Sequence, residues 1–217
     1  MRAVSSIVRA SWKAILDTTS VAVSVRLISP SAMPERSSST ARMLDLDALE
    51  HAVEAVASAP RVDVYGAGSS GLTAQDLGQK LTRIGIACFA PVDLHGQLQS
   101  AALLGEGCVA VAVSHTGTTV ETVQALTLAR DAGATTVAVT NFPASPLAEL
   151  ADVVLATTAR ETQFRSGAMS SRIAQLAVVD FLFVRVAQRR YDRTTAALKA
   201  TYEAVRPHRL TNGRPPR

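Results

Sequence analysis

Short apolar runs alternate with longer amphipathic segments from about residue 60 to residue 190. Five such runs, rich in β-branched residues, are RVDVYG (61–66), IACFA (86–90), CVAVAV (108–113), TTVAVT (135–140) and DVVLAT (152–157). Strands that are apolar at nearly every position are buried on both faces, which requires helices above and below a parallel sheet. The pattern therefore predicts an α/β fold, a three-layer α/β/α sandwich with a five-stranded parallel sheet.

The segments between these runs place apolar residues at helical spacing. The first helix is expected to begin near Leu44 and to end before Pro60, with Asp45 or Asp47 available as its N-cap. Further helices are expected over residues 71–84, 95–104, 119–132, 145–151 and 166–190. The alternation predicts one domain, which spans residues 44–190.

Both flanks differ in composition from this domain. Residues 1–43 are predicted to be a basic segment that contains the Ser/Pro-rich stretch LISPSAMPERSSSTAR, and residues 191–217 a basic C-terminal tail. The net charge is +4, yet residues 45–187 carry eight Lys or Arg against fourteen Asp or Glu. Solvated flanks explain this asymmetry better than a contact with nucleic acid or a partner, because no aromatic-rich or glycine-rich pattern accompanies the basic residues.

The composition also argues against several classes of protein. No apolar run approaches the roughly 20 residues that span a bilayer. Arg9, Lys13 and Asp17 interrupt the first residues before a signal-peptide core forms, so a cytoplasmic location is expected. Cys88 and Cys108 each lie in an apolar run and are expected to be small buried hydrophobes. The four histidines lack metal-ligand spacing, so no metal site is expected.

Two turns that follow predicted strands are rich in glycine and hydroxyl groups. GAGSSG (66–71) follows the first strand, and SHTGTTVE (114–121) follows the third. In an open parallel sheet, ligands bind beyond the carboxyl ends of the strands, where the strand order reverses. Hydroxyl donors, backbone amides and a helix N-terminus favour an anion, and a phosphate group fits such a site without a lysine. Serine and threonine are also ordinary N-caps, so the prediction depends on finding two such turns in one sheet.

A dinucleotide site is the alternative. Gly66, Gly68 and Gly71 match the G-x-G-x-x-G fingerprint, and Asp93 stands near where a ribose-binding acid is sought. Two features disfavour NAD: Asp93 lies beyond Pro91, past the predicted second strand, and the second hydroxyl-rich turn has no role in such a site. A nucleotide P-loop is excluded because the sequence contains no G-x-x-x-x-G-K-[ST].

Both turns resemble the phosphosugar-binding turns of SIS (sugar isomerase) domains. The second motif of that family is S-x-S-G-x-T-x-E, and SHTGTTVE differs from it in Thr116, which keeps the hydroxyl of the usual serine. The similarity continues through ALTLARDAGATTVAVTNFPASPLAELADVVLATTARETQFRSGAMSSRIAQLAVVDFLF and covers residues 44–190. This tract is similar to the sensor half of RpiR-type transcriptional regulators, and the resemblance implies their flavodoxin-like fold.

The resemblance also implies which residues lie near a phosphosugar. The residues expected to bind the ligand are Gly68, Ser69, Ser70, His95, Ser114, His115, Thr116, Gly117, Thr118 and Thr119. The candidate catalytic residues are Glu121, Glu161 and His95. Each has a plainer alternative, as a first-turn helix carboxylate, a solvated surface residue and a helix-start histidine respectively. Arg165 and Arg172 either neutralise the charge of a ligand or flank the last helix.

Two functions are consistent with these residues. The first is a sugar-phosphate sensor, the ligand-binding part of an RpiR-type regulator, which binds a phosphorylated sugar or amino sugar and needs no cofactor. The second is an aldose/ketose sugar-phosphate isomerase, which needs a base close to the substrate carbon. The spacing of Glu121, Glu161 and His95 does not pair them, so the sensor is favoured.

Two expectations concern partners. Residues 1–43 show no pair of helices around a turn, so direct DNA binding by this chain is not expected. An apolar stripe on the helix at 166–190 either belongs to the core or joins copies of the chain in a homodimer or higher homo-oligomer. Its members are Ile173, Leu176, Ala177, Val179, Phe183 and Val184.

Overall fold

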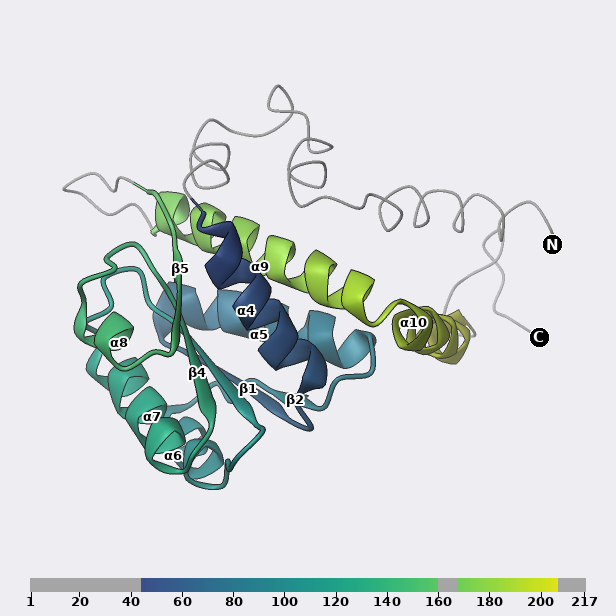
Figure 1. Ribbon diagram of the computed structural model, residues 1–217, viewed down its shortest axis with the longest axis horizontal. Helices are drawn as coiled ribbons and strands as arrows, with labels where there is room; N and C mark the ends of the chain where they lie inside the picture. Colours follow the sequence, from purple (N-terminus) through teal and green to yellow (C-terminus); the bar gives the residue numbers. More distant parts are fainter. Residues whose placement is uncertain (1–43, 160–167, 207–217) are drawn as a thin grey trace.

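The protein contains a sheet of five parallel strands. The computed structural model describes residues 44–159 and 168–206. Its strands are β1 (Val62–Gly66), β2 (Cys88–Phe89), β3 (Val109–Val113), β4 (Thr135–Thr140) and β5 (Val153–Ala156). Their order is β2-β1-β3-β4-β5, and all neighbours are parallel (Figure 1). The predicted parallel sheet is confirmed, although β2 is limited to two residues at one edge.

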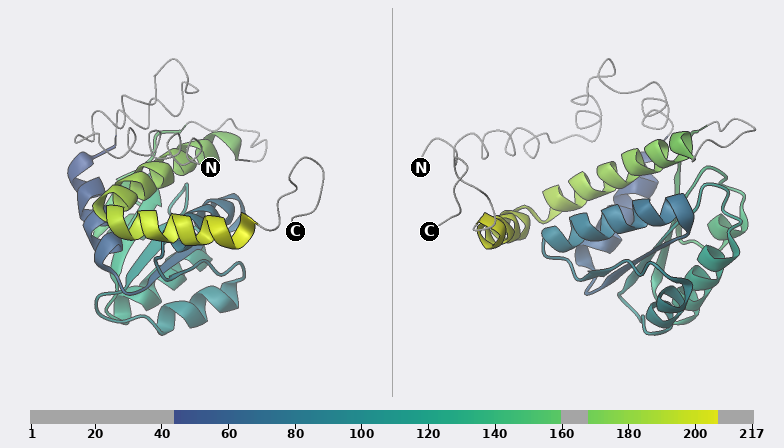
Figure 2. Two further views of the ribbon diagram at one scale, coloured as in Figure 1. Left: turned by 90° about the vertical axis from the view of Figure 1, so that its right-hand side faces the viewer. Right: turned by 180° about the vertical axis from the view of Figure 1, so that it is seen from behind.

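Helices cover both faces of the sheet. They are α4 (Leu46–Ser58), α5 (Gly68–Arg83), α6 (Leu94–Ala102), α7 (Val120–Asp131), α8 (Pro146–Glu149), α9 (Met169–Arg189) and α10 (Tyr191–Val205). One core cluster joins the sheet to α4, α5 and α9, and a second joins it to α6, α7 and α8 (Figures 1 and 2). The three layers of the predicted sandwich are therefore present.

Alternation along the strands gives each face its own kind of side chain. The valines of β3 belong to the core cluster under α4, α5 and α9, whereas Ala110 and Ala112 belong to the cluster under α6 and α7. In β4, Val137 and Val139 are divided from Ala138 in the same way. All these side chains are at most 1% exposed. Burial on both faces is the reason why the runs are apolar without interruption.

Two helix starts refine the prediction. The first helix begins at Leu46, and the Asp45 carboxylate accepts hydrogen bonds from the backbone amides of Asp47 and Ala48, at 2.9 and 3.1 Å. Helix α5 begins at Gly68, three residues before the predicted start. The serines of the first glycine-rich turn therefore belong to the first turn of a helix.

The segment predicted as a basic tail contains α10. This helix packs on α9 and α5 and crosses the end of α9 (Figure 2). Thr194 is its one buried residue. Residues 1–43, predicted to be a basic segment with a Ser/Pro-rich stretch, lie outside the described residues. Among the helices that the structure describes, none has the length and apolar character to span a membrane.

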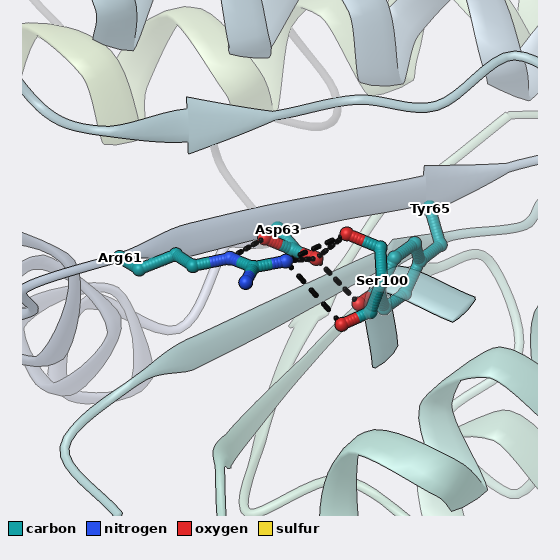
Figure 3. Close-up of polar contacts among 4 residues, drawn as sticks. All are labelled: Arg61, Asp63, Tyr65 and Ser100. Carbon is teal, nitrogen blue, oxygen red and sulfur yellow. Dashed lines mark hydrogen bonds and ion pairs between the residues drawn. The ribbon is translucent and has the colours of Figure 1, made fainter. Parts of the chain in front are cut away.

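A buried polar cluster joins β1 to α6 (Figure 3). Asp63 is fully buried, and its carboxylate accepts two hydrogen bonds from the Arg61 guanidinium, at 2.8 and 2.9 Å. Tyr65 and Ser100 donate their hydroxyl protons to the same carboxylate, at 3.0 and 2.5 Å. A buried carboxylate is tolerated only when it is paired and hydrogen-bonded in this way. The apolar pattern around RVDVYG gave no sign of this cluster.

Burial also changes the acid–base properties of two neighbouring side chains. Two causes raise the pKa of Tyr65 well above its ordinary value: the larger is the removal of the side chain from water, and the smaller is the negative charge of Asp63. The same two causes, in the same order, raise the pKa of the Cys88 thiol to about 12. Cys88 and Cys108 are both free and half-buried. Cys88 is therefore a neutral thiol at neutral pH.

We expect Tyr65→Phe to change how stability depends on pH. A tyrosine whose pKa is raised by folding stabilises the fold fully below its unfolded pKa, about 10, and this contribution is lost as the pH rises further. The free energy of unfolding, measured by urea denaturation, should fall more steeply in the wild type than in Tyr65→Phe above about pH 10. The exposed Tyr191→Phe is the control. Equal slopes for Tyr65→Phe and the wild type would contradict the prediction.

Candidate functional site

A cavity of about 320 Å³ lies beside the carboxyl ends of β1 and β3. The strand order reverses there, because β2 lies on one side of β1 and β3 on the other. Nine residues line the cavity: Ala67, Gly68, Ser69 and Ser70 after β1, His115, Thr116 and Thr119 after β3, and Ala168 and Ser171 at the start of α9. The two turns singled out in the sequence therefore meet in space.

The first turn is folded tightly on its own backbone. A Cβ atom on Gly66 would lie 2.8 Å from the carbonyl oxygen of Ser70, so no other residue fits there without a shift. The amides of Ser70 and Gly71 both donate to the carbonyl of Ala67, at 3.2 and 3.3 Å. These contacts direct the start of α5 toward the cavity.

Two serine hydroxyls of this turn have different surroundings. The Ser70 hydroxyl accepts a hydrogen bond from the side-chain amide of Gln175, at 3.0 Å, and Gln175 is a buried residue of α9. The Ser69 hydroxyl oxygen is buried and has no hydrogen-bond partner in the described parts of the chain. Ser69 therefore offers a donor and an acceptor that the described structure does not use.

The second turn is held from behind by the N-terminal end of α8 and its N-cap, Ser145. Ser114 is buried, and its hydroxyl lies 3.0 Å from that of Thr119 and accepts from the amide of Gly117 at 3.1 Å. Gly117 has a φ of 66°, and a Cβ atom there would lie 2.0 Å from the Ser145 hydroxyl. The Gly117 carbonyl accepts from the amide of Leu147, at 3.0 Å. Only glycine satisfies both this backbone conformation and this packing.

Three helices point uncapped N-termini at the cavity. Side chains cap α4, α6 and α8. In contrast, the N-cap residues of α5, α7 and α9 are Ala67, Thr119 and Ala168, all of which line the cavity, and the described structure gives none of these helices a side-chain cap. Helix α10, which follows α9 directly, is the other uncapped helix of the described residues. Thr119 turns its hydroxyl to Ser114 instead of the helix end.

This arrangement favours an anion. The first amides of a helix have no partners within it, and the helix dipole adds positive partial charge at the same end. Three such ends converge here with the hydroxyls of serine and threonine. The nine lining residues include no lysine, arginine, aspartate or glutamate among the residues described. Within the described residues, an anion would therefore meet backbone amides, hydroxyls and the His115 ring.

Six of the ten predicted ligand-binding residues line the cavity, and four do not. Ser114 and Gly117 are buried directly behind the lining and shape it. Thr118 is exposed and donates its hydroxyl proton to Thr116, at 2.9 Å. His95 is exposed in the first turn of α6 and is not among the lining residues. The hydroxyl-rich part of the prediction is thus gathered at one cavity, and His95 is not.

The two candidate catalytic residues that the structure describes, Glu121 and His95, both lie outside the cavity lining. Glu121 is exposed in the first turn of α7 and does not line the cavity, so its plainer alternative describes its place in the structure. Glu161 and Arg165 lie outside the described residues. Arg172 is half-buried in α9 and does not line the cavity. Of the nine lining residues, His115 alone has an ionisable side chain.

Three lining residues were not predicted. Ala67 precedes the serines of the first turn, and Ala168 and Ser171 come from the start of α9, about a hundred residues later. Small residues around a helix start are the one signal in the sequence that favours such a role. Asp93, weighed as a ribose-binding acid, instead caps α6 by accepting from the amide of Gly96 at 2.9 Å. The dinucleotide alternative thus loses its acid.

The fold and the cavity define an α/β domain with a candidate anion site at the reversal of its strand order. Residues 55–185 match the SIS domain family, and the chain belongs to that family. It is similar to an uncharacterized HTH-type transcriptional regulator of Caldanaerobacter subterraneus subsp. tengcongensis, with 44% identity over 174 residues. The match covers 80% of this chain and 62% of the relative, so the chain spans less than two thirds of that protein.

Two solved structures are similar to this domain. The NanR protein of Vibrio vulnificus, in complex with ManNAc-6P, is 27% identical with a TM-score of 0.76, and the match covers 90% of this chain and 72% of that one. The sugar isomerase domain of an RpiR transcription factor from Sphaerobacter thermophilus is 29% identical with a TM-score of 0.69. That match covers 78% of this chain and 93% of the other. The predicted resemblance to RpiR-type sensor domains is confirmed.

We expect Gly117→Ala to destabilise the fold far more than Gly68→Ala. Both glycines have positive φ, but a Cβ atom on Gly68 meets nothing within 4 Å, whereas one on Gly117 overlaps Ser145. Backbone strain alone costs about 1 kcal/mol, and the overlap should raise the cost for Gly117→Ala to about 3 kcal/mol or more. Urea denaturation measures both. Similar losses for the two variants would show that the second turn is not held by Ser145.

Proposed function

We propose that this chain binds a phosphorylated sugar or amino sugar in the cavity and acts as the ligand-sensing domain of an RpiR-type transcriptional regulator. The observation that carries this proposal is the convergence of three helix N-termini at one cavity, together with serine and threonine hydroxyls. Their N-cap residues are Ala67, Thr119 and Ala168, and the described structure gives none of the three a side-chain cap. A phosphate dianion accepts several hydrogen bonds at once, and such a cradle supplies them without a lysine.

The comparisons support the class of ligand. NanR is described in complex with ManNAc-6P, an amino sugar that carries a phosphate. A phosphosugar needs an anion site for its phosphate and polar groups for its hydroxyls. The turns after β1 and β3 offer both kinds of group to one cavity. Phosphorylated sugars are metabolites of the cell interior, so the proposal includes a cytoplasmic location.

Sensing is favoured over isomerisation by the residues around the cavity. An aldose/ketose isomerase moves a proton between adjacent carbons and needs a base within about 3 Å of the carbon. Within the described residues, Glu121 and His95 do not line the cavity, and His115 packs its ring edge-on against Phe142. Binding needs only the amides and hydroxyls that are already there.

Helix α9 offers a route by which ligand binding in the cavity could affect a distant part of the protein. Ala168 and Ser171 at the start of α9 line the cavity, and the other end of the helix meets α10. A 21-residue helix is about 30 Å long. A ligand that binds better to one position of α9 than to another would shift the protein toward that position. The shift would reach α10, far from the cavity.

The proposal also includes a homodimer formed by the outer face of α9. In the predicted apolar stripe, Ala177 and Val179 are buried in the core. The other members, Ile173, Leu176, Phe183 and Val184, are only partly buried. The core alternative therefore describes the first two, and the proposed homodimer concerns the other four. A second copy of the chain would cover the partly exposed ones.

We expect Thr119→Val to weaken phosphosugar binding by about 1.5–3 kcal/mol, because a hydroxyl that meets a charged phosphate is lost while the shape is kept. Thr118→Val, in the same turn but outside the lining, is the control and should bind like the wild type. Calorimetry with N-acetylmannosamine 6-phosphate, other hexose and pentose phosphates, and unphosphorylated N-acetylmannosamine measures the affinities.

The same panel tests the function. A sensor binds without converting its ligand, so NMR spectra of each sugar phosphate should stay unchanged during incubation with the protein. Turnover of any member would favour the isomerase. Failure of every phosphorylated member to bind, or equal affinity in Thr119→Val and the wild type, would argue against the site.

We expect the wild type to sediment as a dimer and Leu176→Glu to shift it toward the monomer, because a charge on the outer face of α9 opposes burial. Leu128→Glu places the same change on an exposed residue of α7 and should leave the dimer intact. Analytical ultracentrifugation gives the masses, and circular dichroism checks that both variants fold. A monomeric wild type at about 50 µM would contradict the dimer, since stable interfaces bind more tightly than this.

A further inference from the structure

We propose that Gln97 is a positioning residue for the proposed anion site. Its side chain holds the peptide at which the turn after β1 begins. The role rests on the proposed function, because it acts on the turn that would meet the phosphate. Gln97 itself is not among the residues that line the cavity. It belongs to α6, on the face that packs against β1.

The side-chain amide of Gln97 joins α6 to the end of β1. Gln97 is 3% exposed, and its Nε2 atom donates to the carbonyl of Gly66 at 2.9 Å and to that of Pro91 at 3.1 Å. Gly66 is the last residue of β1, and Ala67, the next residue, lines the cavity. The hydrogen bond therefore fixes the carbonyl of the peptide whose nitrogen belongs to Ala67.

A change in this peptide would be passed on to the cavity. The backbone of Gly66 touches Ser70 so closely that a Cβ atom there has no room. Ser70 and Gly71 are in turn held by the carbonyl of Ala67. A rotation of the Gly66 peptide would therefore displace the first amides of α5, which are the donors that face the anion.

Helix α6 is anchored well enough to act as a support. Its N-terminus is capped by Asp93. One turn after Gln97, the Ser100 hydroxyl contacts both Asp63 and Arg61 (Figure 3). Asp63 and Gly66 are three residues apart on β1, and their partners Ser100 and Gln97 are three residues apart on α6. The strand and the helix are thus joined at two points. The contact between Gln97 and Gly66 is the one at the start of the turn that lines the cavity.

The position requires the donor end of a glutamine. The Oε1 atom of Gln97 is buried and has no hydrogen-bond partner in the described residues. A buried acceptor without a partner lowers stability, so the side chain is not optimised for stability. Both of its described hydrogen bonds are donated to carbonyl oxygens. A glutamate would direct a carboxylate at these two oxygens and repel them.

The test is amide hydrogen exchange in the full, unliganded chain. Gln97→Met keeps the length of the side chain and removes the donor, and we expect the amides of Ser70 and Gly71 to exchange about tenfold faster. The β3 amides should keep their wild-type rates, because the variant also removes the unpaired Oε1 and should leave global stability nearly unchanged. Gln99→Met, the same change at an exposed position of α6, is the matched control.

Two results of this experiment would overturn the proposal. One is wild-type exchange at Ser70 and Gly71 in Gln97→Met. The other is a proportional increase at these amides and throughout β3, because this would mean that Gln97 only stabilises the whole fold.

Binding provides the second measurement. We expect Gln97→Met to bind N-acetylmannosamine 6-phosphate, or any other sugar phosphate that the wild type binds, about tenfold more weakly, with Gln97→Glu weaker still and Gln99→Met unchanged. Wild-type affinity in Gln97→Met would overturn the positioning role. If the wild type binds no sugar phosphate, the proposed function fails, whereas the exchange measurement still decides whether Gln97 holds the turn.

Discussion

The site depends on the parallel pairing of β1 with β3. These strands are hydrogen-bonded neighbours although β2 lies between them in the sequence, and their register pairs Gly66 with Val113. Both strands therefore end at the same level, and the turns that follow them start side by side. A register shift of one residue would also turn the buried faces of the strands toward the wrong layers. The pattern that builds the core thus also fixes where the two turns meet.

The two turns build the proposed anion site from backbone and hydroxyl groups. Lysine or arginine would bring positive charge on a long side chain that must be ordered on binding, whereas helix N-termini are already fixed by the fold. This arrangement needs small residues close to the helix starts, and the lining contains alanine, glycine, serine and threonine apart from one histidine. It also brings neighbouring atoms so close to Gly66 and Gly117 that no side chain fits at either position without a shift.

Support for the site comes from residues that do not touch the cavity. Ser145 and Leu147 hold the second turn, Gln175 holds a serine of the first, and Gln97 holds the peptide before it. The buried Asp63 cluster anchors α6 through Ser100, one turn after Gln97. These contacts come from several different elements, so the shape of the cavity depends on how most of the domain packs. Such a site can couple a bound ligand to helix position, which is what a sensor needs.

Much of the fold was determined by the sequence alone. The five strands, the layers around them and the meeting of GAGSSG with SHTGTTVE follow from local periodicity and from the rule that parallel strands end together. The tertiary structure decided the rest. It placed His95 and Glu121 outside the cavity lining, brought Ala168 and Ser171 into it, and set Gln97 behind Gly66. Periodicity reports which face of an element is buried, but the contacts of a side chain with residues thirty or a hundred positions away depend on how whole elements pack.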